Sequence, residues 1–357
     1  MKNCLAKTGF MVAYLCGAVM CGYCDSCITN DTIIYQISGK HGVVVVDRIK
    51  SVGDCKINLF IPRSVMGYDV HGIGDNAFLN DLSICSVNIE QGVWRIGDNA
   101  FRGCSALERV VLPDSLLILG HQSFMGCSKL EEVRLPGMLT DGSGSRAFAG
   151  CESLSRVVIA DDLSCDIVPF FYECGGVNEF VVGSNQMYRV IDGCLYDSTC
   201  RVFVRCPIKL SSSDYRVRDG VMGIAACAFF SCRSLRRVLL PDTLREIGDA
   251  AFGCSGLEEV ALPDGVSYLG MESFAGCTNL HSAYLPRSVS YVGINCFTKS
   301  SGLRKIVFMG DRPKIEDCEV GIGTRNCDII VPKDAKGWCT TNTLWGLQVR
   351  RCDAFSR

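Results

Sequence analysis

The sequence predicts a solenoid, which is a stack of short coils in which each coil contacts mainly the coils before and after it. Two neighbouring stretches carry nearly the same pattern. Residues 96–113 read IGDNAFRGCSALERVVLP, and residues 119–136 read LGHQSFMGCSKLEEVRLP, a step of 23 residues. A pattern that recurs at a fixed period of roughly 20 to 50 residues is typical of repeat architectures.

The phenylalanine of this pattern recurs over most of the chain. Its nine copies are Phe78, Phe101, Phe124, Phe148, Phe171, Phe229, Phe252, Phe274 and Phe297. Successive copies are 22 to 24 residues apart, except for a gap of 58 residues after Phe171. We attribute the single step of 22 residues to a missing residue at the position of Arg102, which aligns Cys254 with Cys104. We expect the rings to lie one over another in a common core.

Each copy divides into two halves with different physical demands. Residues 107–113 alternate apolar and variable positions, which is the period of a half-buried strand, and Pro113 ends the strand because proline has no amide to donate. Residues 96–104 are too short for an ordinary helix and contain Gly97 and Gly103. This half predicts a tight or 3₁₀-like turn.

The pattern I-G-x-x-A-F-x-G-C-x-x-L-x-x-V-x-L-P resembles the BspA-like leucine-rich repeat family, over roughly residues 57–310. Members of this family are mostly surface or secreted proteins of bacteria and some protists. The resemblance implies a curved leucine-rich repeat solenoid, mostly β with little regular helix. A parallel β-sheet would line its concave face, and short 3₁₀ or helical turns its convex face. It also implies adhesion or protein binding, without catalytic residues.

The N-terminal residues 1–24 are expected to be a secretory signal peptide. Lys2 and Lys7 precede an apolar run at 9–20, and its 12 residues are too few to span a bilayer. Two other interpretations remain open: an intracellular protein with an apolar start, and a lipid anchor at Cys21, which the large residue Met20 before it disfavours. We therefore expect a secreted or cell-surface protein.

The remaining chain is expected to form five parts. They are an N-terminal β cap at 25–72, repeats at 73–182, a β-hairpin insertion at 183–222, repeats at 223–310 and a C-terminal cap at 311–357 with Trp338 and Trp345. In the insertion, residues 188–197 and 200–207 are expected to form a strand, a turn and a strand, and this segment resembles an insertion common in the family. It either binds a partner or is a plain hairpin.

Two groups stand out among the 24 cysteines. Seven share one position of the repeat and are expected to be core thiols, which behave as small hydrophobic groups: Cys104, Cys127, Cys151, Cys174, Cys232, Cys254 and Cys277. Because parallel side chains give poor disulfide geometry, bridges are more plausible elsewhere. Candidates are the group Cys194, Cys200 and Cys206, the pair Cys318 and Cys327, and the pair Cys339 and Cys352.

No combination of residues points to catalysis, a cofactor or a metal. Cys21, Cys24 and Cys27 have the spacing of zinc ligands, but no fourth ligand is evident. The histidines His41, His71, His121 and His281 have no fixed acidic partner, and Gly321 and Gly323 lack the setting of a phosphate-binding loop. We expect no enzymatic activity and no small-molecule substrate.

Charge and hydropathy narrow the class of partner. The net charge of −2, with no basic stretch, argues against nucleic acid. No segment after residue 24 is long and apolar enough to be a transmembrane segment. A protein ligand, of unknown identity, is the expected partner.

Two columns of side chains should point outward from the sheet. The first is Ser86, Arg109, Glu132, Arg156, Glu179, Arg237, Glu259, Ser282 and Lys305, where alternating charges favour stabilisation of the sheet over recognition. The second is Asn88, Val111, Arg134, Val158, Val181, Leu239, Ala261, Tyr284 and Val307. All of the second column except Ala261 form the expected ligand-binding face, although β-branched residues are also simply good strand formers.

We therefore expect a secreted or surface scaffold that binds a protein or mediates adhesion through this face. The alternative is a structural envelope or matrix component that associates with copies of itself.

Overall fold

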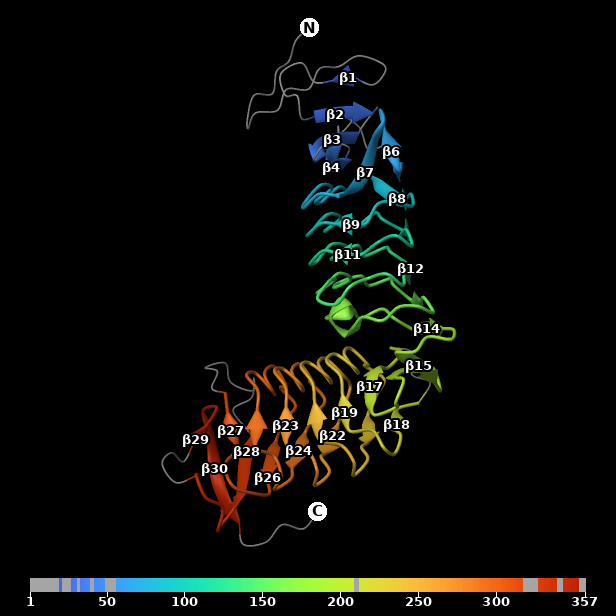
Figure 1. Ribbon diagram of the computed structural model, residues 1–357. Helices are drawn as coiled ribbons and strands as arrows, with labels where there is room; N and C mark the ends of the chain where they lie inside the picture. Colours follow the sequence, from blue (N-terminus) through green and yellow to red (C-terminus); the bar gives the residue numbers. More distant parts are fainter. Residues whose placement is uncertain are drawn as a thin grey trace. The chain divides into compact units, whose positions relative to one another are not determined.

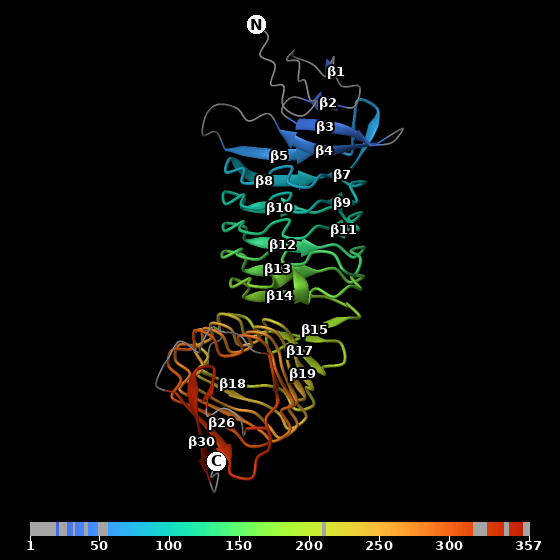
Figure 2. The same ribbon diagram turned by 90° about the vertical axis from the view of Figure 1, so that its left-hand side faces the viewer.

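The computed structural model describes residues 19–20, 27–30, 33–38, 42–48, 56–208, 212–316, 327–338 and 343–352. Most of the expected signal peptide lies outside these residues, as do Cys21, Cys24, His41, Cys318 and Cys339. The chain forms two compact units (Figures 1 and 2). Unit 1 comprises residues 1–177 and 181–187, and unit 2 comprises residues 178–180 and 188–357.

Unit 1 is a stack of coils that carry two ladders of short strands. The main sheet has the order β14 (Glu179–Val182), β13 (Arg156–Ile159), β12 (Glu132–Leu135), β10 (Arg109–Val111), β8 (Ile84–Ile89) and β5 (Ile57–Ile61). The pairs from β5 to β13 are parallel, with Arg109 opposite both Ser86 and Glu132. Equivalent residues of successive repeats therefore lie side by side.

The second sheet of unit 1 begins with antiparallel strands and then becomes a parallel ladder. It runs β1 (Val19–Met20), β2 (Cys27–Asn30), β3 (Ile33–Ser38), β4 (Gly42–Arg48), β7 (Tyr68–Ile73), β9 (Arg95–Ile96) and β11 (Ile118–Leu119), and β6 (Ser64–Val65) pairs with β7. β3 and β4 form an antiparallel hairpin, and β4 then pairs in parallel with β7. The sequence pattern did not indicate the two-residue strands, because it placed residues 95–96 at the start of a turn.

Unit 2 has the same two kinds of ladder. One sheet runs β15 (Tyr188–Ile191), β16 (Cys194–Asp197), β17 (Val202–Arg205), β19 (Gly223–Ile224), β21 (Glu246–Ile247), β23 (Tyr268–Leu269), β25 (Tyr291–Val292) and β27 (Lys314–Ile315). A second, two-stranded sheet of unit 2 pairs β18 (Asp214–Arg216) with β20 (Arg237–Leu239). A six-stranded sheet follows: β22 (Glu259–Ala261), β24 (Ser282–Leu285), β26 (Lys305–Phe308), β28 (Asp328–Pro332), β30 (Leu347–Cys352) and β29 (Thr343–Leu344).

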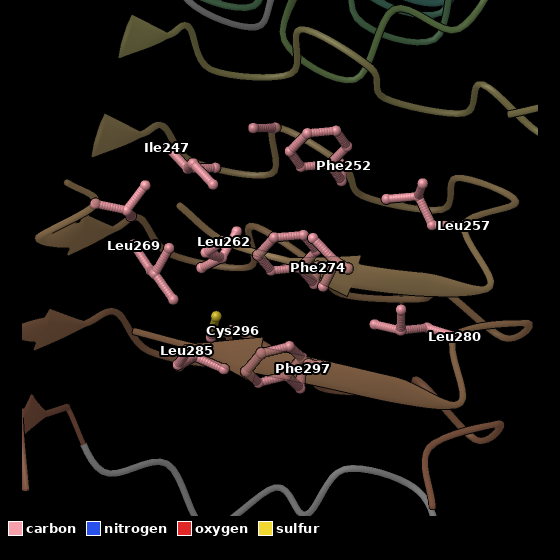
Figure 3. Close-up of a cluster of buried hydrophobic side chains, with 14 of the residues drawn as sticks. Ile247, Phe252, Leu257, Leu262, Leu269, Phe274, Leu280, Leu285, Cys296 and Phe297 are labelled. Carbon is pink, nitrogen blue, oxygen red and sulfur yellow. The ribbon is translucent and has the colours of Figure 1, made fainter. Parts of the chain in front are cut away.

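Stacked phenylalanine rings run through the core of each unit, as the repeat predicts. In unit 1, ring centroids from Phe78 to Phe171 are 5.0, 5.1, 5.6 and 5.5 Å apart. In unit 2, the distances from Phe229 to Phe297 are 4.9, 5.2 and 5.4 Å. Figure 3 shows three of these rings with leucines beside them. Each stacked pair adds roughly 0.5 to 1.5 kcal/mol beyond the burial of its area.

The phenylalanines lie on turns whose backbone groups also form a ladder between coils. The amides of Asn99, Phe101 and Gly103 donate to carbonyls of the next coil, at 2.9, 2.7 and 2.7 Å. Asn99 and Gly103 have φ values of +53° and +74°, so left-handed residues flank the phenylalanine.

The amides at the alternate positions, those of Ala100, Arg102 and Cys104, donate to carbonyls three residues earlier in the same coil, at 3.4, 3.1 and 3.1 Å. These are tight turns of the kind that the sequence predicts. Within the described part of the chain, one turn forms a regular 3₁₀ helix, Val168–Phe171.

The cysteine position is a hydrogen-bond donor as well as a small core residue. The thiols of Cys104, Cys127, Cys151 and Cys277 donate to the phenylalanine carbonyl of the preceding coil, at 3.0 to 3.2 Å. Cys174 and Cys232 are also buried. At the same position Ser300 donates to the carbonyl of Phe274 at 2.8 Å. This position of the repeat therefore requires a small side chain that can donate a hydrogen bond.

The assignment of Cys254 to this column is wrong. Cys254 is exposed, and its φ of +55° and its amide bond to the next coil place it where other repeats have glycine. Ser255 is buried in the column and lies 3.4 Å from the thiol of Cys277. The repeat is short because Leu257 follows Ser255 by two residues, whereas Leu107 follows Cys104 by three.

The insertion contains one more strand than the sequence indicated. Asp192 and Gly193, with φ of +50° and +77°, form a two-residue turn that pairs β15 with β16, and β17 then pairs antiparallel with β16. β17 also pairs in parallel with β19. Phe203 in β17 stacks on Phe229 at 4.6 Å, so it begins the ring column of unit 2.

The C-terminal tryptophans pack against the last coils of unit 2. The ring of Trp345 meets Phe297 edge-on at 6.0 Å, and the ring of Trp338 lies 4.9 Å from Phe308. The indole of Trp338 donates to the carbonyl of Gly310 at 3.4 Å. These contacts cover the end of the ring column, as a cap would.

Replacing a ring within the column tests its contribution to stability. We expect Phe124→Ala to lower the free energy of unfolding by about 3 to 5 kcal/mol, because the fully buried ring leaves a cavity between two rings. Val111→Ala, at an exposed position of the same unit, should change it by less than about 0.5 kcal/mol. Denaturant unfolding measures both, and equal losses would contradict the account.

Close backbone approach at the second ladder gives a further prediction. A Cβ added at Gly120 would lie 2.3 Å from the carbonyl carbon of Gly97. We expect Gly120→Ala to destabilise the protein by on the order of 3 kcal/mol. At Gly223 the added atom would meet the flexible side chain of Glu246, so Gly223→Ala should cost less than about 1 kcal/mol in the same unfolding measurement.

Candidate binding face

The outward side chains of the main sheet form two rows in unit 1. β5 contributes to both, because Asn58 lies opposite Ser86, and Phe60 lies opposite Asn88. The second row then continues through Val111, which also lies opposite Asn88. Phe60 and Val111 are 49% and 56% exposed.

Five predicted face residues lie in unit 1, and they differ in how accessible they are. Asn88, Val111 and Arg134 are exposed, whereas Val158 and Val181 are half-buried. The guanidinium of Arg134 is paired with Asp114 at 2.6 Å. The accessible apolar part of this face is therefore concentrated at Phe60 and Val111, with Asn88 between them.

Phe60 was missed because the two outward columns were begun at residues 86 and 88, although residues 57–61 had been interpreted as the strand half of a repeat within the cap. The signal was present in the sequence: residues 57–62 end in proline as the strand halves of the repeats do. Counting back from Pro62 by the offset that links Val111 to Pro113 reaches Phe60. The same offset would have added Phe60 to the second outward column.

The other three predicted face residues lie in unit 2, and one of them is not accessible. Leu239 is 60% exposed. Tyr284 is half-buried, and the ammonium of Lys305 lies 4.6 Å above its ring and 2.5 Å from its hydroxyl. Val307 is buried, because Tyr284 and Ile330 flank it on the neighbouring strands, so its place in the face is a wrong prediction.

The charged row beside these residues is largely paired within itself. Arg156 binds Glu132 at 2.8 Å, and Arg237 binds Asp214 through two nitrogens at 3.0 and 2.5 Å. The Arg237 guanidinium holds the pKa of the Asp214 carboxyl below its ordinary value. Exposed pairs of this kind contribute little to stability, but they leave few unpaired charges for a partner.

The described residues contain no cluster of three or more His, Cys, Asp or Glu side chains arranged to hold a metal ion. His121 is exposed and donates its amide to Asp98, and a ring nitrogen of His281 lies 3.4 Å from the carbonyl of Asn279. His71 packs near Trp94 at 6.4 Å. Within the described part of the chain, no helix is long and apolar enough to cross a membrane.

Solved structures of bacterial leucine-rich repeat proteins resemble this chain in fold. One, from Eubacterium ventriosum, has a TM-score of 0.66 at 18% identity and covers 85% of this chain and 82% of its own. The leucine-rich cell surface protein of Faecalibacterium prausnitzii has a TM-score of 0.54 at 21% identity, covering 92% and 95%. The pneumococcal vaccine antigen PcpA has a TM-score of 0.57 at 16% identity, covering 92% and 99%.

No curated protein matches the sequence at a significant level. The sequence pattern of the BspA-type leucine-rich repeat region matches residues 71–202 and 201–318, with 6 copies. These ranges include both ring columns and cover more than half of the chain. The chain therefore belongs to the BspA-type leucine-rich repeat family.

Proposed function

We propose that this protein is a secreted or cell-surface scaffold that binds a protein ligand through the outward faces of its main sheets. The observation that carries the proposal is the exposure of Phe60, Val111 and Leu239 on those faces. Exposed large apolar side chains beside charges that already have partners are suited to burial against another protein.

The surroundings of these residues favour a protein over other partners. The chain has a net charge of −2, whereas nucleic acid is usually bound by a basic surface. The arginines near the face bind carboxylates of their own unit: Arg134 binds Asp114 in the turn after β10, and Arg237 binds Asp214 in β18. We propose binding rather than catalysis as the activity of the chain, in a protein that acts outside the cell.

Two features support a location outside the cell. The sequence begins with a short basic segment and an apolar run of signal-peptide length. One structure of similar fold is described as a cell surface protein, and another as a vaccine antigen. The signal peptide at 1–24 and adhesion as the biological role are parts of this proposal.

The same apolar residues could instead pack against a second copy of the chain. The structural alternative, an envelope or matrix component, predicts self-association. Size-exclusion chromatography with light scattering at several concentrations distinguishes the two. A monomer at all concentrations supports ligand binding, and growth of the assembly that Val111→Asp abolishes supports the structural role.

Charge placed on the face tests the binding function. We expect the double variant Val111→Asp, Leu239→Asp to lose roughly tenfold or more in affinity for a protein captured from a panel of purified extracellular proteins, because a carboxylate would be buried in the complex. The matched control is Met138→Asp, Met271→Asp, since these side chains are 55% and 47% exposed outside the main sheets.

Surface plasmon resonance gives the affinities of wild type and both variants, and circular dichroism checks that each variant is folded. Full affinity in the Val111→Asp, Leu239→Asp protein, or an equal loss in the control, would contradict the proposed face. Such a result would direct attention to the hairpin β15–β17 instead.

A further inference from the structure

Three buried thiols gather where the hairpin β15–β17 joins the first coils of unit 2. Cys194 begins β16, and Cys206 follows directly after β17. Because Leu195 pairs with Arg205 in antiparallel register, Cys194 and Cys206 lie opposite each other. Their sulfur atoms are 3.8 Å apart, and both side chains are buried. Cys232 of the following coil is the third thiol.

This arrangement differs from that of the cysteine column. A column thiol such as Cys127 or Cys277 donates to a carbonyl of the preceding coil, on parallel segments of chain. Cys194 and Cys206 instead face each other across two antiparallel strands, where opposite Cβ atoms are roughly 4.5 to 5.5 Å apart. A disulfide needs Cβ atoms at roughly 3.5 to 4.5 Å, so side-chain rotation and a small approach of the strands suffice.

The polar surroundings of Cys194 in the folded unit also differ from those of the column thiols. The hydroxyl of Tyr215 donates to its sulfur at 3.2 Å and lies 3.3 Å from the hydroxyl of Tyr196. Hydrogen bonds from Cys206 and Tyr215 lower the pKa of Cys194. In contrast, burial raises the pKa of the column thiol Cys277 to about 11.

We propose that Cys194 and Cys206 form a disulfide that fastens the hairpin β15–β17 when the protein folds in an oxidising compartment. The thiol of Cys232 lies 4.0 Å from the carbonyl of Pro207 and also interacts with the thiol of Cys206, but from the next coil and not from the paired strand. Cys200 lies beyond β16 in a turn and is partly exposed. Neither of them has the cross-strand position of the proposed pair.

The bond forms by exchange with a low-molecular-weight disulfide such as oxidised glutathione. The thiolate of Cys194 attacks one sulfur of that disulfide, breaks its S–S bond and releases one small thiol after protonation. The thiolate of Cys206 then attacks the sulfur of Cys194 and releases the second small thiol. Two protein thiols are oxidised, and one small disulfide is reduced to two thiols. Because both cysteines are buried in the folded unit, exchange precedes closure of the hairpin onto the coil.

Peptide mapping of the full chain tests the proposal. The protein is refolded with reduced and oxidised glutathione, its free thiols are blocked with N-ethylmaleimide, and it is digested with trypsin without reduction. We expect the peptide of residues 190–201 to be joined to the peptide that begins at Cys206. The mass of the pair should be about 2 Da below the sum of the two free peptides, since two hydrogens leave.

Residues 190–201 contain both Cys194 and Cys200, so a matched pair of variants assigns the bond. The link should persist in Cys200→Ser and disappear in Cys194→Ser. Fragment ions from cleavage between Leu195 and Tyr196 assign it in the wild-type protein, independently of how the variants fold. Blocked thiols at Cys194 and Cys206, a bond from Cys200, or a bond between Cys206 and Cys232 would each overturn the proposal.

Discussion

The structure depends on the exact vertical repetition of the coils, because each coil satisfies its neighbours' backbone groups and covers their side chains. On the turn side, amides such as those of Phe101 and Gly103 have their acceptors on the next coil. On the strand side, equivalent residues pair in parallel register. The rings of Phe101 and Phe124 stack only when the hydrogen bonds of the turns and those of the strands are both formed. A long insertion such as the hairpin β15–β17 is therefore tolerated between the repeats of unit 1 and those of unit 2. Within the repeats of one unit, an insertion would break both ladders.

The same repetition explains why the surface is a plausible place for recognition. The inward positions of the coils are occupied by a phenylalanine ring, a small side chain that donates a hydrogen bond, and branched aliphatic residues. Outward positions of the main sheet are free to vary, and the chain has filled them with paired charges in one row and with Phe60, Val111 and Leu239 in the other. Variation at these positions changes the partner without disturbing the core.

Much of the fold could be predicted from the sequence because four residue types recur in a fixed register. Phe124 and Cys127 are buried for the reasons that this register indicates. Cys254 was misplaced because an alignment on residue letters does not show which position requires a positive φ, and here cysteine occupies the glycine position. Phe203 was missed because it enters the ring column from a strand, without the Ala, Ser or Cys that precedes most of the other rings. Accessibility was least predictable: Val307 repeats the pattern of Val111, but its neighbours on adjacent strands bury it.

Native-state hydrogen exchange at the amides of Phe101, Phe124 and Gly126 tests the stacking of coils most directly. These amides donate to Ser123, Ala147 and Ala149 of the following coils, and they lie on turns that would exchange quickly in an isolated repeat. We expect their protection to match that of Val133 in the main sheet, because one cooperative unit contains both. Rapid exchange at the turn amides beside a protected sheet would contradict the view that the coils are held together on both sides.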